Sequence, residues 1–182
     1  MFRRAISAEA FVGARMISDP INLMDASPIG DGAAAAILID AERLSKSGSK
    51  ILVAASTAAT DTLSIHNRKA PLRLSAAEKS SREAYEQAGI NQWDIDLFEY
   101  HDAFTIMAAL SLEACGFASP GKGPTLAKEG AIKINGKIPV ATRGGLKARG
   151  HPVGATGMYQ IVELVQQLRG EAGETQISNT IF

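Results

Sequence analysis

Apolar residues recur at helical spacing in three segments, which predicts helices over residues 75–88, 105–115 and 155–169. Ser75 and Glu78 predict a capping box at the first of them, and Gly89 is expected to end it. The predicted buried face of the third helix is Met158, Ile161, Val162, Val165 and Leu168, with Gln160, Glu163, Gln166 and Gln167 facing solvent. A short amphipathic helix is expected from Ala8 to Met16, ending before Pro20.

Short apolar runs bounded by turn residues predict strands over residues 33–39, 51–55, 97–100 and 138–142. The first is uninterrupted by polar residues and is expected to be buried on both faces. Residues 40–49 are expected to be a short polar helix or loop, and residues 116–136 an irregular excursion. Alternating strands and helices predict an α/β fold with a largely parallel sheet built from right-handed crossovers.

Composition and charge limit the classes of function. The 182 residues are enough for one domain with a core, and we expect a connecting segment over 1–24 and one domain over 25–182. Lys plus Arg equals Asp plus Glu at 19 each, which argues against nucleic acid or an anionic membrane as partner. No apolar run is long enough to span a bilayer, and Glu9 interrupts any signal-type segment. The lone cysteine, Cys115, cannot form an internal disulfide, which fits a reducing compartment, so the chain is expected to be cytoplasmic. The Cys115 side chain is interpreted as part of the core.

Polar residues follow the predicted strands at the edge where open α/β sheets bind ligands. Ser56 and Thr57 follow one strand, His101 follows another, and His151 lies in the loop after residues 138–142. Two histidines on one rim favour a chemical function. No third ligand has convincing spacing, so no metal site is expected.

The loop around His151 allows two interpretations. It holds Gly144, Gly145, Gly150, Gly154 and Gly157, and His151 stands just before a helix N-terminus, which favours a neutral, proton-accepting ring. Alternatively, the histidine caps a turn that the glycines merely shape. A nucleotide site is weakly supported, because neither GxGxxG nor GxxxxGK[ST] occurs. The basic loop over residues 60–71, with His66, Arg68 and Lys69, is interpreted as solvated surface, with contact to ligand phosphates as the alternative.

Four collinear motifs resemble the C-terminal half of a thiolase, especially the sterol-carrier-protein type and its archaeal and bacterial relatives. They are DASPIGDGAAA (25–35), HDAF (101–104), GGLKARGHPVGATG (144–157) and QLRGEAG (167–173). The resemblance implies half of a thiolase fold: a mixed, mainly parallel sheet with helices on both faces, here expected to lack the last two strands of that half.

The resemblance also implies a thiolase-type acyltransferase that cleaves a 3-oxoacyl-CoA or runs the reverse Claisen condensation from acetyl-CoA. In that family a cysteine from the N-terminal half is the nucleophile, the histidine matching His151 accepts its proton, and the one matching His101 donates to an oxyanion. Coenzyme A is then a substrate, and no further cofactor is expected. The candidate substrate-binding residues are Ser56, Thr57, Gly145, Gly150 and Gly154.

Departures from the family pattern qualify this expectation. The nucleophilic cysteine is not among these residues, and Cys115 does not match its motif. Relatives usually have a cysteine where this chain has Ala103, which carries no ionisable group. We therefore expect this chain alone to be inactive and to require an N-terminal thiolase half or partner subunit in a homo- or hetero-oligomer. The alternative is a non-catalytic acyl-CoA-binding, lipid-binding or scaffolding subunit; a ketoacyl-synthase-type enzyme is the weaker third possibility. Burial of His151, or its separation from His101, would exclude the enzymatic interpretation.

Overall fold

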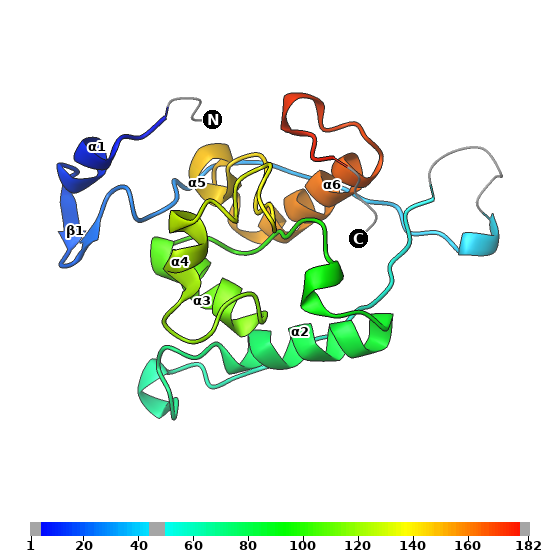
Figure 1. The fold of residues 1–182 in the computed structure, drawn as a ribbon, viewed down its shortest axis with the longest axis horizontal. Coiled ribbons are helices and arrows are strands. Elements are labelled where there is room, and N and C mark those ends of the chain that lie inside the picture. The colour runs from blue at the N-terminus through cyan, green and yellow to red at the C-terminus, as the bar shows by residue number, and fades with distance from the viewer. Residues whose placement is uncertain (1–4, 44–49, 179–182) are drawn as a thin grey trace.

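The computed structural model describes residues 5–43 and 50–178. Its body is built from helices: α2 (Ser75–Ala88), α3 (Thr105–Ala114), α4 (Gly123–Lys128), α5 (Gly145–Arg149) and α6 (Thr156–Leu168). At one edge lie α1 (Ala8–Val12) and a hairpin of β1 (Met16–Ser18) and β2 (Ile21–Asn22) (Figure 1). Short 3-10 helices are η1 (Ala41–Arg43), η2 (Ile65–Asn67), η3 (Gln92–Asp94), η4 (Val153–Ala155) and η5 (Gly173–Thr175).

The main apolar core lies between α3 and the chain around residue 138. Leu112, Cys115, Phe117 and Ile138 form its buried centre. The Phe98 and Phe117 rings lie 5.0 Å apart within its surroundings. Burial raises the pKa of the Cys115 thiol. The cysteine is therefore core packing, as the sequence predicts.

Strand pairing in the described residues is limited to the antiparallel β1–β2 hairpin and isolated bridges. One parallel bridge joins Phe98 to Val140: the Phe98 amide donates to Pro139 at 2.9 Å, and the Ala141 amide donates to Phe98 at 3.0 Å. Two of the predicted strands, 97–100 and 138–142, thus meet side by side in the expected parallel sense.

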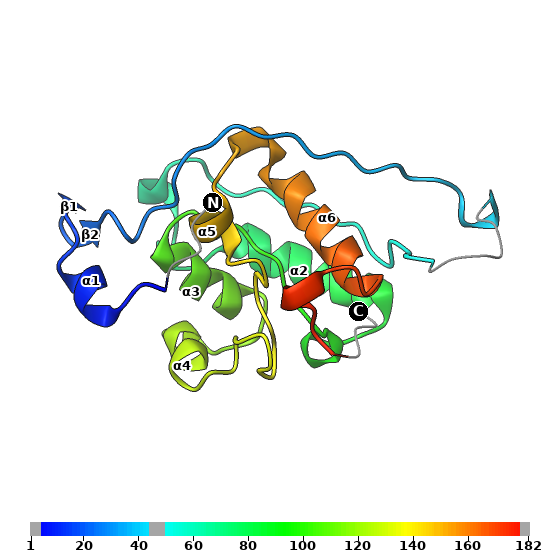
Figure 2. The ribbon, with the colours of Figure 1, turned by 90° about the horizontal axis from the view of Figure 1, so that it is seen from above.

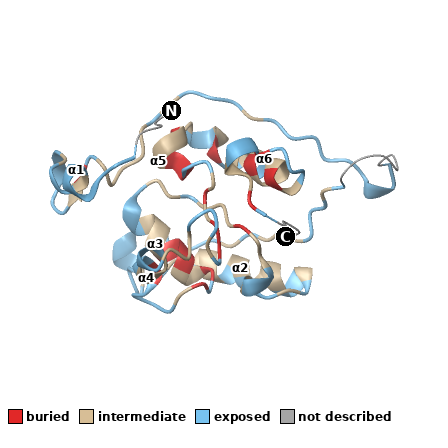
Figure 3. Cartoon of the chain, turned by 45° about the horizontal axis from the view of Figure 1, so that its top comes forward, coloured by how far each residue is buried: buried red, intermediate tan, exposed pale blue. Residues whose placement is uncertain are grey.

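The predicted strands 33–39 and 51–55 both run as extended chain, and the first of them lacks the burial that was expected of it. They run as long arms along and beyond the body (Figure 2), and Ile37 is 89% exposed. Figure 3 shows the same arms as mostly exposed chain. The expectation that residues 33–39 are buried on both faces is wrong for this structure, because all of them are exposed except Ala34, which is half-buried. Of the predicted loop 40–49, residues 44–49 lie outside the described residues.

Helix bounds agree closely with the predicted ranges for α2, α3 and α6. The left-handed Gly89, with φ +70°, ends α2 as expected. The predicted capping box is wrong: Leu74 is the N-cap, and the Glu78 carboxylate instead accepts two hydrogen bonds of 2.6 Å from Arg73. Helix α1 ends at Val12, earlier than predicted, while α4 and α5 lie in segments interpreted as loops.

The predicted orientation of α6 is wrong. Its buried residues include Glu163 and Gln167, 4% and 1% exposed, while Ile161 is 46% exposed. The Gln167 amide donates to Thr142 at 2.9 Å and accepts from the Ile177 amide at 3.0 Å. Such partners satisfy buried polar groups. The helix therefore turns a polar face toward its own chain and leaves part of its apolar face uncovered.

Candidate functional site

Three sequence-distant segments meet at the site: residues 25–30, the turn at 101–104 and the loop before α6. The first lies between the other two and bonds both through its backbone. The Ser27 amide donates to Ala103 at 2.9 Å, Thr105 to Asp25 at 3.0 Å, His151 to Pro28 at 2.8 Å, and Gly30 to His151 at 3.3 Å. Because backbone hydrogen bonds fix position without depending on rotamers, this segment sets the separation of the two histidine-bearing turns.

His101 and His151 lie against each other. Their ring centroids are 4.8 Å apart with an interplanar angle of 78°, so that one ring presents its edge to the other. His101 is exposed and His151 is half-buried, so both can be reached from outside the chain. The condition that would have excluded the enzymatic interpretation is not met.

The ring of His151 has one of its two nitrogens engaged. Nδ1 lies 2.6 Å from the hydroxyl oxygen of Thr156, the first residue of α6, which is almost fully buried. A hydrogen bond at one ring nitrogen determines which tautomer the other presents. If Nδ1 carries the hydrogen and donates it to Thr156, Nε2 is left with a free lone pair to accept a proton.

Asp102 connects His101 to helix α5. Its Oδ1 accepts from the Leu146 amide at 3.0 Å in the first turn of that helix. Gly145 lies directly against the carboxylate with φ +60°, so any Cβ there would collide with it. Partial burial of the ring and the neighbouring His151 lower the pKa of His101, and the charge of Asp102 partly opposes this shift. The neutral His101 ring is thereby favoured near neutral pH, and one of its nitrogens can donate a hydrogen bond.

Lys147 fixes the first segment from the other side. Its Nζ donates to the carbonyls of Leu23 and Ala26 at 3.1 and 2.5 Å. Burial lowers the pKa of this ammonium, and Asp25 opposes the shift. Because its ammonium group binds these two backbone carbonyls, the role of Lys147 is to support residues 25–30.

The candidate substrate-binding residues are distributed unevenly. Gly145 and Gly150 border the site; Gly150, with φ +97°, directly precedes His151. Gly154 faces open space. Ser56 and Thr57 are held against α2 instead, where the Ser56 amide donates to Gln87 at 3.0 Å and the Thr57 hydroxyl to Ser80 at 2.7 Å. A substrate role for these residues stays a prediction.

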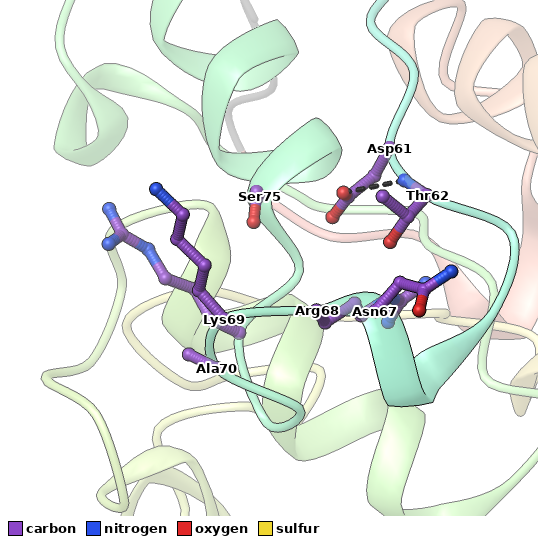
Figure 4. Close-up of a pocket in the computed structure, with 8 residues that line it drawn as sticks. Asp61, Thr62, Asn67, Arg68, Lys69, Ala70 and Ser75 are labelled. Carbon is purple, nitrogen blue, oxygen red and sulfur yellow. Dashed lines mark hydrogen bonds between the residues drawn. The ribbon is translucent and has the colours of Figure 1, made fainter.

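The basic loop before α2 forms an open pocket lined in part by Asp61, Arg68 and Lys69 (Figure 4). The Lys69 side chain extends away from Asp61, and the Asp61 carboxylate accepts a hydrogen bond of 2.7 Å from the Thr62 amide. The lining thus carries both signs of charge. Phosphate contact at this loop stays the alternative prediction.

Within residues 5–43 and 50–178, no three His, Cys, Asp or Glu side chains converge as a metal site requires. In that same part of the chain, none of the helices combines the length and the hydropathy needed to cross a bilayer.

Sequence reasoning overlooked the supporting residues Thr156, Asp102 and Lys147. All three stand inside the motifs that carried the resemblance, within five residues of a histidine, and each bears a polar side chain. Proximity to the histidines was an available signal. The contacts themselves join residues as far apart as Lys147 and Leu23, which no local pattern encodes.

Comparison with known proteins assigns the chain to a family. Residues 57–181 match the thiolase C-terminal domain-like family. The chain is 42% identical to an acetyl-CoA acetyltransferase of Methanothermobacter thermautotrophicus over 97% of its own length and 46% of that protein. It is 36% identical to sterol carrier protein 2 of Oryctolagus cuniculus, covering 97% of this chain and 33% of that protein.

The fold has a counterpart among solved structures. A chain of the Ltp2-ChsH2(DUF35) aldolase superposes with a TM-score of 0.80 at 21% identity, covering 98% of this chain and 47% of that one. This chain therefore spans half or less of the length of the relatives it matches. The motifs, the fold and the sequence relatives agree, and the chain belongs to the thiolase family, in which it corresponds to the C-terminal domain.

Proposed function

We propose that this chain is the C-terminal domain of a thiolase-type acyltransferase that acts on 3-oxoacyl-CoA or acetyl-CoA. The observation that carries the proposal is the edge-on pairing of His101 and His151, with centroids 4.8 Å apart on an accessible surface. Two accessible imidazoles held this close together suit proton transfer and oxyanion binding.

The proposed chemistry divides the work between the two rings. His151 accepts the proton of a cysteine thiol supplied by a different segment, and the thiolate attacks the 3-oxo carbon of the substrate. The bond between C2 and C3 then breaks, the acyl group stays on sulfur, and the acetyl-CoA carbanion leaves with the proton that His151 had accepted. The neutral His151 ring can then accept the proton of the coenzyme A thiol. Neutral His101 donates a hydrogen bond to the developing oxyanion, which typically contributes about 100- to 1000-fold in rate. Thiolate of coenzyme A finally takes the acyl group from sulfur.

The thiol has to come from outside the described residues, because Cys115 is buried in the core. An N-terminal thiolase half, on the same polypeptide or a partner, is the proposed source. Uncovered apolar surface on the arms and on α6 supports a large missing neighbour, as Ile37, Leu52 and Ile161 are exposed. The name of the structurally similar Ltp2-ChsH2(DUF35) aldolase joins two components, which supports an oligomeric arrangement here.

The test is reconstitution. The chain is assayed for cleavage of acetoacetyl-CoA with coenzyme A, first alone and then with the N-terminal half of an acetyl-CoA acetyltransferase. We expect turnover only in the mixture, reduced at least about 100-fold by His151→Ala. The control Lys79→Ala changes an exposed position on α2 and is expected to keep full activity. Thiolysis by the chain alone, or an active His151→Ala mixture, would overturn the proposal.

A second candidate is a non-catalytic acyl-CoA-binding or lipid-binding subunit. Ala103 favours it, since no side chain at that position can protonate the carbanion. The name of the rabbit relative, sterol carrier protein 2, points in the same direction. Calorimetric titration with acetoacetyl-CoA distinguishes the two candidates when it is combined with the reconstitution. Binding with no turnover in the mixture supports the second candidate.

A further inference from the structure

The ionisable ends of three side chains are buried on the segments that carry the histidine pair and on α6. Glu99 lies two residues before His101, Arg149 lies two residues before His151, and Glu163 is on α6. The Arg149 Nε is 2.8 Å from Glu163 Oε1, and these side chains are only 9% and 4% exposed. The three groups therefore join the two histidine-bearing segments to the helix that both segments contact.

The cluster is not electrically balanced if both carboxyl groups are ionised. No N–H or O–H group of the described residues donates to either oxygen of Glu99 or to Glu163 Oε2, and none of the three guanidinium nitrogens of Arg149 makes a hydrogen bond there. The Glu99 and Glu163 carboxyl groups face each other closely enough to form a hydrogen bond when one of them is protonated. One guanidinium cannot neutralise two buried carboxylates, and an unpaired buried charge is strongly unfavourable. A single proton shared between Glu99 and Glu163 leaves one negative charge opposite Arg149.

Burial and the neighbouring charges favour a protonated carboxyl group in this pair. Burial and the charge of Glu163 raise the pKa of Glu99 to about 8; Arg149 acts in the opposite direction, and Asp102 adds to the rise. Burial also raises the pKa of Glu163, against Arg149 and Arg143. The charged groups that act on the pair are Arg149 on α5, Arg143 before that helix, and Asp102 next to His101.

We propose that Glu99, Glu163 and Arg149 form a proton-sharing brace that positions His101 and His151 relative to each other. The three are positioning residues, because they act through the histidines. A further contact supports the brace: the Gln160 amide of α6 donates to the Tyr100 carbonyl, between Glu99 and His101. The importance of the histidine spacing rests on the proposed function, but the brace itself can be tested without turnover.

The brace predicts a specific pH dependence of folding. The unfolded chain releases the Glu99 proton near the ordinary glutamate pKa of about 4.3, while the folded chain keeps it until about pH 8. Between these values the folded state binds more protons, so stability falls as pH rises. The Glu99 contribution should increase the unfolding equilibrium constant by up to about tenfold per pH unit from pH 5 to 8, and the lowered pKa of His101 opposes this increase below about pH 6.5.

The experiment compares the unaltered chain with Glu99→Gln, Glu163→Gln and the control Glu86→Gln, which changes an exposed carboxylate on α2. Urea unfolding is measured from pH 5 to 9. Either substitution in the brace should flatten the slope, because no shared proton remains, whereas Glu86→Gln should leave it unchanged. Glutamine mimics the neutral carboxyl, so Glu99→Gln is expected to fold at neutral pH.

The second measurement is NMR of the histidine rings over the same pH range. The ring signals of His101 and His151 should show a chemical-shift step near pH 8 that disappears in Glu99→Gln; the signals of His66, outside the cluster, should lack it. A flat slope in the unaltered chain, an unchanged slope or step in Glu99→Gln, or unfolding of Glu99→Gln at neutral pH would overturn the brace. Failure of reconstituted thiolysis would overturn the proposed function and leave these readouts unaffected.

Discussion

The Nδ1 atom of His151 lies 2.6 Å from the hydroxyl oxygen of Thr156, at the first turn of α6. Proton acceptance from a thiol requires a free lone pair on the other ring nitrogen. If Nδ1–H donates to Thr156, that condition is met before any substrate arrives. In that arrangement Thr156, the first residue of α6, selects the proton-accepting tautomer of His151.

Replacing Thr156 by valine tests this relationship. Valine keeps the shape and removes the hydroxyl, so the ring should populate both neutral tautomers, and stability should fall by about 1 kcal/mol. Ring nitrogen chemical shifts of His151 report the tautomer directly. Thr156→Ser restores the hydroxyl and should restore the single tautomer. An unchanged tautomer in the valine variant would show that another group orients the ring.

The helices were predictable from the sequence because their signals are local. The apolar spacing of α3 and the left-handed Gly89 that ends α2 are encoded within a few residues. The orientation of α6 was not, because Glu163 and Gln167 would face solvent on any amphipathic reading. They are buried only because Arg149, Thr142 and the chain near Ile177 supply partners.

The site could be predicted in part for the same reason. His101 and His151 were identified from their motifs and their places after strands, and the structure does bring them together. Ser56 follows a strand in the same way, yet α2 holds its backbone. The expectation that ligands bind at the carboxyl ends of strands applies to a paired sheet. The segment before Ser56 is an unpaired extended arm in the described structure. Glu99 carried no sequence signal, since its burial depends on α6.

Substitution of Asp102 separates a helix-capping role from an electrostatic one. Asp102 accepts from the Leu146 amide and also opposes the lowering of the His101 pKa. Asp102→Asn keeps an acceptor oxygen but loses the charge, so the His101 pKa should fall further with little loss of stability. Asp102→Ala loses both and should cost about 1 kcal/mol. NMR titration of His101 and urea unfolding measure the two effects.

The lowered pKa of His101 also determines how the stability of the fold depends on pH. The folded His101 binds a proton less readily than the unfolded chain, so its contribution to stability is present above the unfolded pKa of about 6.5 and is lost as the pH falls through the folded pKa. Asp102→Asn should enlarge that loss on acidification. A His101 pKa that rises in Asp102→Asn would contradict the assigned electrostatic role.

The exposed arms predict that the isolated chain associates with itself. Extended segments with unpaired backbone groups and exposed apolar side chains, such as Ile37 and Leu52, are templates for pairing with another chain. The urea midpoint should therefore rise with protein concentration, and sedimentation should show species larger than one chain.

Ile37→Lys should reduce both effects, since charge on an unpaired strand opposes pairing. Leu63→Lys, at a 99% exposed position on the loop before α2, serves as the matched control and should reduce neither. A concentration-independent midpoint with high stability would mean that the arms need no partner, and the argument for a large missing neighbour would then lose its support.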